Sequence, residues 1–419
     1  MPNDDPSFPN SCSASPRGAG SSLIPAPCRR GGFCWSPVLL LLVVAALVLA
    51  GCGSGSDSDS ASDSGKQSSA KSAEPVILSS DGTEFSPSRI YKEAVPGVVS
   101  VRSIFTGKSA GPFGPQAAGG SGFVLNDDGE IVTNAHVISN GEGDDRVPAS
   151  QVYAEFTDGN VLPAKVVGFD PFADVGLLQV DPADADLDPV GLADSDQVVV
   201  GQPIAVIGSP FGQNQSLSTG IVSQTGRSVM SLTDFQIEGA IQTDASINPG
   251  NSGGPMLDGN GDVIGISQQM SSGSGSSDGV GFGVPVNSIK RSVEQLRENG
   301  EARYAYIGVS TQPLYPQLAE KLGIDAERGA IVAQVVDGSP AAKAGLRGGD
   351  EKIRFQGSQF DTGGDVIVSA DGEKIDRAED LGRIVSTLEP GKTIRLEVIR
   401  DGKTETVEVE LDDRPTSIR

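Results

Sequence analysis

The strongest constraint on the fold of this chain is a series of short apolar runs separated by polar turns, between about residues 86 and 299. Residues 122–125 and 130–133 are two such runs, and the Asn-Asp-Asp-Gly turn between them predicts a β-hairpin. The 55 glycines and the low aromatic content of 5% also favour turn-rich β structure over helical bundles. Many short strands at this spacing predict a barrel or a sandwich.

One helix is expected within this segment, at residues 287–298. Ile289, Val293 and Leu296 recur on one helical face, and Gly300 suits a helix stop.

The start of the chain has the pattern of an export signal. Arg29 and Arg30 precede the apolar run 37–50, whose core of about 14 residues is short for a membrane span of roughly 20 but suits a signal sequence. The run ends in Leu-Ala-Gly-Cys, which resembles the bacterial lipoprotein cleavage box. By that resemblance residues 1–51 are removed and Cys52 is lipidated; an uncleaved signal anchor is the alternative. Both place the rest of the chain outside the cytoplasm, in the cell envelope.

Residues 52–85 are rich in Ser, Gly and Asp and contain few apolar side chains, so we expect a disordered tether. The formal net charge of −24 disfavours nucleic acid as a partner. All four cysteines lie within the first 52 residues, and the chain has one histidine. The usual zinc ligands are therefore missing from the rest of the chain, and we predict neither a metal nor a cofactor.

The only histidine, His136, limits the kinds of serine hydrolase that the chain can be. Ser252 lies in Gly-Asn-Ser-Gly-Gly-Pro, a pattern that also fits α/β hydrolases, but their catalytic histidine follows the serine. The subtilisin order needs an acid before the histidine, where the candidates, such as Asp127 and Asp128, are weakly placed. The chymotrypsin order fits His136, Asp174 and Ser252.

The chemistry assigns a role to each member of this set. Ser252 needs a base to take its proton, and His136 is the only imidazole. Asp174, at the entry of an apolar strand, is predicted to orient that imidazole, although spacing alone leaves Asp170 open. The backbone N–H groups of Gly250 and Ser252 are predicted to form an oxyanion hole.

Three sequence blocks, TNAHV, ADVGLL and TDASINPGNSGGP, resemble those of the HtrA (Deg) family of serine proteases. The resemblance covers about residues 86–413. It implies two six-stranded barrels with the site between them, ATP-independent cleavage of unfolded or mislocalised envelope proteins, and a homotrimer. The loop 106–118 is short beside the regulatory loop of some relatives, which argues against larger cages.

The primary substrate pocket is expected to be walled by Ile247, before the serine turn, and by Ile266, in a later strand. No acidic residue is evident there, so we expect small or medium apolar side chains to be preferred. The Ser/Gly-rich loop 268–279 beside the pocket is predicted to be mobile.

A second domain is predicted over residues 303–413. Tyr306, Ile307, Gly308 and Val309 resemble the carboxylate-binding loop of a PDZ domain, which captures C-terminal peptides as an added strand. Residues 339–346 match the short helix of that fold, and the helix 377–388, which includes Ile384, is expected to line the groove. Residues 347–364 are predicted to be an inserted hairpin.

The sequence therefore predicts a mainly β protein: a signal with lipobox (1–51), a tether (52–85), a chymotrypsin-like double-barrel protease domain (86–299) and a PDZ domain (303–413). The predicted function is that of a membrane-anchored envelope serine endopeptidase of protein quality control, regulated by PDZ peptide binding. A dedicated signalling or processing protease, and a chaperone or adaptor with little proteolysis, are the alternatives.

Overall fold

The computed structural model describes residues 85–209, 215–268 and 279–417. The predicted signal, Cys52 and almost all of the tether lie outside the described residues, as does most of the loop 268–279. Within the described residues, no helix combines the length and apolar character that a membrane crossing requires.

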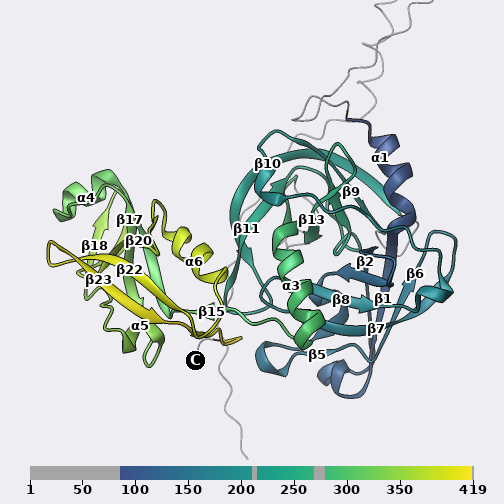
Figure 1. The fold of residues 1–419 in the computed structure, drawn as a ribbon, viewed down its shortest axis with the longest axis horizontal. Coiled ribbons are helices and arrows are strands. Elements are labelled where there is room, and N and C mark those ends of the chain that lie inside the picture. The colour runs from purple at the N-terminus through teal and green to yellow at the C-terminus, as the bar shows by residue number, and fades with distance from the viewer. Residues whose placement is uncertain (1–84, 210–214, 269–278, 418–419) are drawn as a thin grey trace, which may run out of the picture. The chain divides into compact units, whose positions relative to one another are not determined.

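Six strands of the protease segment close into a first barrel in the order β1-β2-β3-β8-β7-β6 (Figure 1). The antiparallel pairing of β2 with β3, which sets Val124 opposite Ile131, confirms the predicted hairpin. The barrel is filled by apolar side chains that include Val99, Ile138 and Leu178. Its strands are β1 (Val98–Phe105), β2 (Gln116–Val124), β3 (Glu130–Thr133), β6 (Gln151–Glu155), β7 (Val161–Asp170) and β8 (Val175–Gln179).

A second closed barrel follows, in the order β10-β11-β14-β13-β12-β9. Closure leaves neither barrel with a free sheet edge. Two closed six-stranded barrels are the chymotrypsin-like fold that was predicted. The strands are β9 (Pro203–Gly208), β10 (Ser216–Met230), β11 (Gln236–Thr243), β12 (Pro255–Leu257), β13 (Val263–Gln268) and β14 (Gly281–Pro285).

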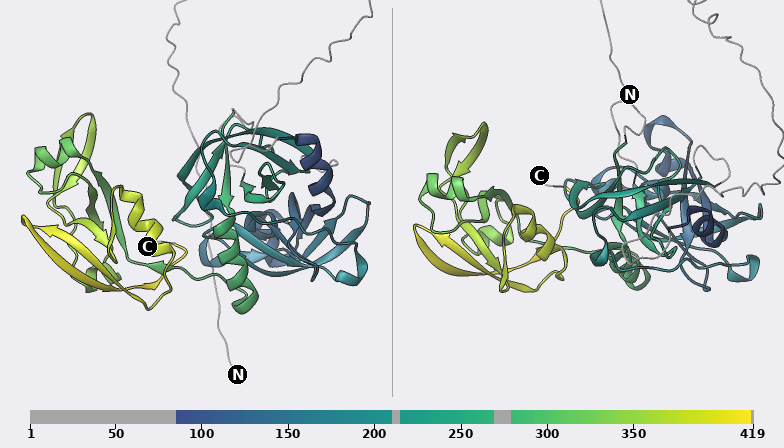
Figure 2. Two further views of the ribbon diagram at one scale, coloured as in Figure 1. Left: turned by 45° about the horizontal axis from the view of Figure 1, so that its top comes forward. Right: turned by 90° about the horizontal axis from the view of Figure 1, so that it is seen from above.

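The helix α3 (Val286–Asn299) packs across strands of both barrels (Figure 2). Ile289, Val293 and Leu296 are buried along one face in the core that the two barrels share, as the sequence predicted. The helix ends at Gly300, whose φ of 75° gives the left-handed cap that glycine adopts most readily. Smaller elements of this domain are α1 (Pro87–Ala94), α2 (Ala135–Ile138), β4 (Ser139–Asn140) and β5 (Val147–Pro148).

The remaining elements form a second fold around its own apolar core, with a main sheet in the order β16-β17-β20-β22-β23 and β21 beside β20. These strands are β16 (Val309–Leu314), β17 (Gly329–Val335), β20 (Val366–Ala370), β21 (Glu373–Lys374), β22 (Thr393–Arg400) and β23 (Lys403–Glu410). Its helices are α4 (Pro316–Leu322), α5 (Pro340–Lys343) and α6 (Ala378–Ser386). A short ribbon pairs β15 (Ala305–Tyr306) with β24 (Asp412–Asp413).

The predicted insertion is a hairpin, β18 (Glu351–Phe355) with β19 (Ser358–Thr362). Its Phe360 is only 6% exposed and packs in a small core with Leu318 of α4 and Ile399 of β22. The hairpin therefore adds a second apolar layer to this domain.

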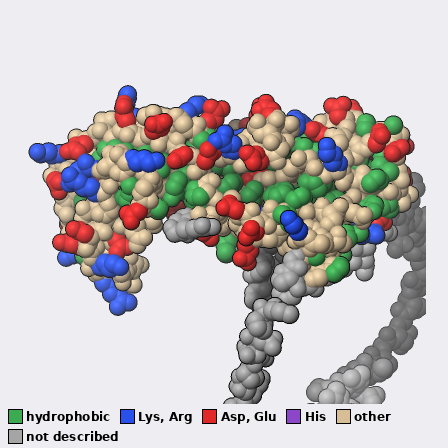
Figure 3. All heavy atoms as spheres, turned by 90° about the horizontal axis from the view of Figure 1, so that it is seen from below, with side chains coloured by type: hydrophobic (Ala, Val, Ile, Leu, Met, Phe, Trp, Pro, Cys, Tyr) green, Lys and Arg blue, Asp and Glu red, His purple; other side chains and the backbone are tan. Residues whose placement is uncertain are grey.

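On the face shown in Figure 3, acidic and basic side chains are interspersed. The acidic excess of the chain is thus not gathered into one block on that face. Such mixing suits solubility rather than the binding of one strongly charged partner.

Candidate active site

His136 is carried by the one-turn helix α2, which follows β3 directly. This helical turn is anchored to the barrel because Ala135, Val137 and Ile138 are all buried. The imidazole is left on the outer side, with 32% of its side-chain surface exposed.

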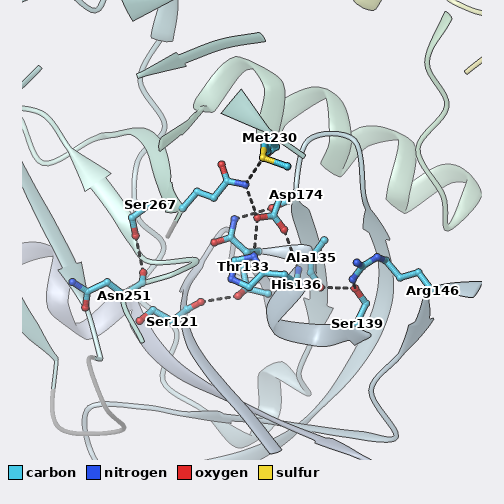
Figure 4. A network of polar contacts seen from close by, with 12 residues as sticks. Ser121, Thr133, Ala135, His136, Ser139, Arg146, Asp174, Met230, Asn251 and Ser267 are labelled. Atoms are coloured by element: carbon cyan, nitrogen blue, oxygen red, sulfur yellow. Dashed lines mark hydrogen bonds and ion pairs between the residues drawn. The ribbon is translucent and has the colours of Figure 1, made fainter. Parts of the chain in front are cut away.

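Asp174 contacts His136 through both of its carboxylate oxygens (Figure 4). Oδ2 lies 2.7 Å from the imidazole Nδ1, and Oδ1 accepts the backbone N–H of His136 at 3.0 Å. The Asp174 side chain is fully buried, and its backbone has the unusual φ of 54°. Asn134 donates its Nδ2–H to the Asp174 carbonyl at 2.8 Å, which holds this strained turn against the end of β3.

Asp170, the alternative acid, occupies a different environment. Its Oδ1 accepts the backbone N–H groups of Phe172 and Ala173 at 2.8 and 3.1 Å. Its Oδ2 lies 2.6 Å from the hydroxyls of Ser292 and Tyr304. Of the two carboxylates, Asp174 is therefore the one that contacts the imidazole.

The pKa of His136 is raised above its usual value of 6.5. Burial lowers this pKa, but the charge of Asp174 and its hydrogen bond raise it by more, and the charge of Arg146 lowers it in part. The protonated form of His136 is thus stabilised, and this is the form that a general base adopts after it has taken a proton.

Ser252 lies in the turn between β11 and β12, packed against the first barrel. Its carbonyl accepts the N–H of Ser121 in β2 at 2.8 Å. The next residue, Gly253, has a φ of 86°, and a Cβ there would collide with the Ser121 carbonyl and lie 3.0 Å from the backbone nitrogen of Asn134. Glycine thus lets the serine turn approach the segment that leads into His136.

The serine turn is fixed by hydrogen bonds to its carbonyl groups. Ser121 Oγ donates to the Gly250 carbonyl at 2.7 Å, and Ser267 Oγ donates to the Asn251 carbonyl at 2.6 Å. Gly250 itself has a φ of 100°. Within the described residues, no hydrogen bond engages the N–H groups of Gly250 and Ser252, the two predicted oxyanion donors.

The two predicted pocket residues differ in their surroundings. Ile247 is 5% exposed, and its Cδ1 would touch any Cβ placed on Gly281, so the absence of a side chain at Gly281 makes room for it. Ile266 is fully buried in the core shared by the barrels, because its strand turns it inward. Both side chains are therefore buried in this structure.

A hollow of about 290 Å³ borders the predicted carboxylate-binding loop. Residues of that loop, Tyr306, Ile307, Gly308 and Val309, line it. From α6 it is lined by Leu381 and Val385, and the predicted Ile384 is not among its lining residues. All three side chains also pack in the core of this domain, so α6 borders the hollow as predicted but Ile384 faces the core.

Comparisons with known proteins agree with this geometry. A family model described as a trypsin-like peptidase domain matches residues 120–266, and one described as a PDZ domain matches residues 305–411. A chloroplastic Protease Do-like 1 of Arabidopsis thaliana is 36% identical over 337 residues, which cover 79% of this chain and 73% of that protein. The chain belongs to the HtrA (Deg) family of serine proteases.

Bacterial members of the HtrA family show the same relationship. A probable periplasmic DegP-like serine endoprotease of Pseudomonas putida is 38% identical over 296 residues. The match covers 71% of this chain and 56% of that protein, so the chain spans little more than half the length of such relatives. A solved HtrA-type protease, AlgW with a tripeptide, is 31% identical with a TM-score of 0.65; the match covers 79% of this chain and 98% of that one.

Two further residues near the predicted triad of this HtrA-family chain had no sequence signal. Gln268, at the end of β13, donates its Nε2–H to Asp174 Oδ2 at 3.1 Å. Arg146 donates to Ser139 Oγ at 3.1 Å, and Ser139 donates to the Ala135 carbonyl at 2.6 Å, within the helix that carries His136. The Gln268 contact joins segments far apart in the sequence, so local pattern could not reveal it. The Arg146 contact spans only seven residues, but no sequence motif marks it.

Proposed function

We propose that this chain is an envelope serine endopeptidase that hydrolyses peptide bonds of unfolded or misfolded proteins. One observation carries the proposal: the buried Asp174 carboxylate holds His136 by its ring and backbone, and the Ser252 turn packs against the segment that leads into His136. Membership of a serine protease family adds support.

In the proposed mechanism, the Nδ1–H of His136 donates to Asp174, which leaves Nε2 unprotonated as the base. Ser252 Oγ attacks the carbonyl carbon of the scissile bond while His136 takes the hydroxyl proton. The tetrahedral intermediate collapses as His136 gives this proton to the leaving amine. Water, activated by the same imidazole, then hydrolyses the acyl-enzyme and releases Ser252.

The negative charge of the tetrahedral intermediate would be stabilised by the N–H groups of Gly250 and Ser252. Each oxyanion donor is typically worth about 2.7–4 kcal/mol in such enzymes. The hydrogen bonds of Ser121 and Ser267 to the carbonyl groups of this turn would hold the donors in place before substrate arrives.

The hollow beside Tyr306–Val309 is proposed to bind the C-terminal residues of peptides and so to regulate proteolysis. A carboxylate would meet the backbone N–H groups of the loop, and the peptide would add as a strand. The match to the PDZ model supports this assignment, as do solved relatives described as AlgW with a tripeptide and with a decapeptide.

The place of action is proposed to be the cell envelope, outside the cytoplasm, because bacterial relatives are named periplasmic. Lipidation at Cys52 would anchor the chain, and a homotrimer would be its assembly, as the family resemblance implies. Cys52→Ser should then release the protein from membrane fractions into the soluble fraction, whereas a signal anchor would keep it bound.

The proposed substrate class is tested by digestion of unfolded casein beside a panel of folded envelope proteins. Quality control predicts rapid and broad cleavage of casein with little cleavage of the folded panel. Cleavage of one folded protein with casein left intact would instead indicate a dedicated processing protease. Binding of casein without cleavage would indicate a chaperone.

A further inference from the structure

Asp170 is a completely buried carboxylate that the proposed mechanism does not use. Four donors surround it: two backbone N–H groups on Oδ1, and the hydroxyls of Ser292 and Tyr304 on Oδ2. Burial raises the pKa of Asp170, and hydrogen bonds from Ser292 and Tyr304 offset part of that rise. A buried carboxylate is tolerated only where its hydrogen-bond partners remain in place.

The backbone donors of Asp170 belong to the turn that leads into Asp174. Phe172 and Ala173 are held by Oδ1, and Asp174 follows at once with its φ of 54°. A non-glycine residue in that conformation persists only when its surroundings fix it. Asp170 therefore fixes the turn whose end presents the carboxylate of Asp174 to His136.

Tyr304 reaches this turn from the junction between the two domains. Its hydroxyl lies 2.6 Å from Asp170 Oδ2, and its ring packs against Phe172 of the turn at a centroid distance of 5.2 Å. Burial raises the pKa of Tyr304 well above 10, so the hydroxyl keeps its proton and donates at any working pH. Tyr304 is only 7% exposed, so its ring cannot leave this position without repacking of its neighbours.

The covalent neighbours of Tyr304 belong to the peptide-binding domain. Strand β15 begins at the next residue, and the predicted carboxylate-binding loop starts at Tyr306. After β24, the partner of β15, the N–H of Arg414 donates to the Tyr304 carbonyl at 2.8 Å and its guanidinium lies over the ring at 5.3 Å. A shift of this ribbon would therefore move Tyr304.

We propose that Tyr304 is a positioning residue for the predicted triad acid: through Asp170 its hydroxyl fixes the turn that presents Asp174 to His136. The proposal rests on the proposed function only in so far as Asp174 serves catalysis. In this role, Tyr304 is a direct connection between the proposed peptide-binding domain and the active site.

The test is the variant Tyr304→Phe in the full chain, which removes one oxygen and keeps the ring against Phe172. Tyr153→Phe is the matched control, because the Tyr153 hydroxyl has only an exposed contact with Gln151. Ser292→Ala removes the other hydroxyl donor of the same carboxylate oxygen and should act in the same direction.

The primary readout is the magnetic resonance signal of His136, which is unambiguous because the chain has one histidine. The charges that act on the His136 imidazole are those of Asp174 and Arg146. The charges that act on the pair Asp170 and Tyr304 are those of Arg414 and Arg291. None of these groups is altered in Tyr304→Phe. Because Asp174 raises the pKa of His136, loosening its turn should lower that pKa and speed exchange of the Nδ1 proton.

Hydrolysis of a fluorogenic peptide is the second readout. A displaced carboxylate should lower kcat roughly tenfold and leave KM nearly unchanged. A purely structural role for Tyr304 would lower the melting temperature but leave the His136 titration and kcat as in Tyr153→Phe, and that result would overturn the proposal. The His136 signal does not depend on proteolysis, so the proposal can be judged even if the wild type cleaves nothing, which would refute the proposed function instead.

Discussion

His136 and Asp174 are joined by two hydrogen bonds, one from the ring and one from the backbone of the histidine. The carboxylate therefore fixes the tautomer of the imidazole and also the helical turn that carries it. Gln268 adds a third donor to this carboxylate, at the oxygen that faces the ring. In the neutral imidazole, a proton held at Nδ1 by Asp174 leaves Nε2 free to accept one.

The first prediction concerns the pH dependence of proteolysis. A base must be neutral to accept the serine proton, so activity is lost as pH falls through the pKa of His136. Because that pKa is raised, the acidic limb of kcat/KM should have its midpoint above pH 6.5. A midpoint clearly below this value, measured on a fluorogenic peptide, would contradict the assignment of the base.

Removal of the Asp174 charge tests the orienting role of this residue. Asp174→Asn keeps the size of the side chain, but its amide can stabilise the wrong tautomer of His136. We expect kcat to fall by about four orders of magnitude, as in other triads of this kind. Circular dichroism should show that the fold is retained. A loss of kcat of less than about tenfold would mean that another carboxylate orients His136.

Arg146 is predicted to adjust the pKa of His136 through its charge. Its charge lowers the pKa of His136, so Arg146→Met should raise that pKa and move the acidic limb of kcat/KM to higher pH. Arg102→Met is the matched control, since Arg102 lies on the surface and pairs with Glu155. An unchanged profile, or a shift to lower pH, would count against the coupling.

The predicted carboxylate-binding loop gives a prediction of stability. Gly308 has a φ of 81°, and a Cβ there would collide with Ser339. Gly372 has nearly the same φ of 84° but nothing within 4 Å. Both alanine variants carry the backbone strain of about 1–3 kcal/mol, and only Gly308→Ala adds the collision. Thermal unfolding should therefore show the larger loss of stability for Gly308→Ala. Equal losses of stability would show that the loop moves away from the collision without a cost in free energy.

Much of the fold and site could be predicted because the signals are local or unique. The hairpin at 122–133 follows from its turn, and a lone histidine allows only one catalytic order. Asp170 and Asp174 could not be separated by spacing, since both stand near the same strand end and only the three-dimensional turn decides which faces His136. The choice among the apolar residues of α6 is open for a similar reason, because only packing against the sheet decides that Leu381 and Val385, and not Ile384, border the hollow.

The most direct test of the account is labelling of the full chain with a fluorophosphonate probe, which reacts with activated serines. Wild type should be labelled, Ser252→Ala should not, and His136→Ala should lose nearly all labelling, because no second imidazole can replace it. Equal labelling of Ser252→Ala and wild type would place the nucleophile elsewhere. Undiminished labelling of His136→Ala would show that the serine is activated without the histidine, and would contradict the account.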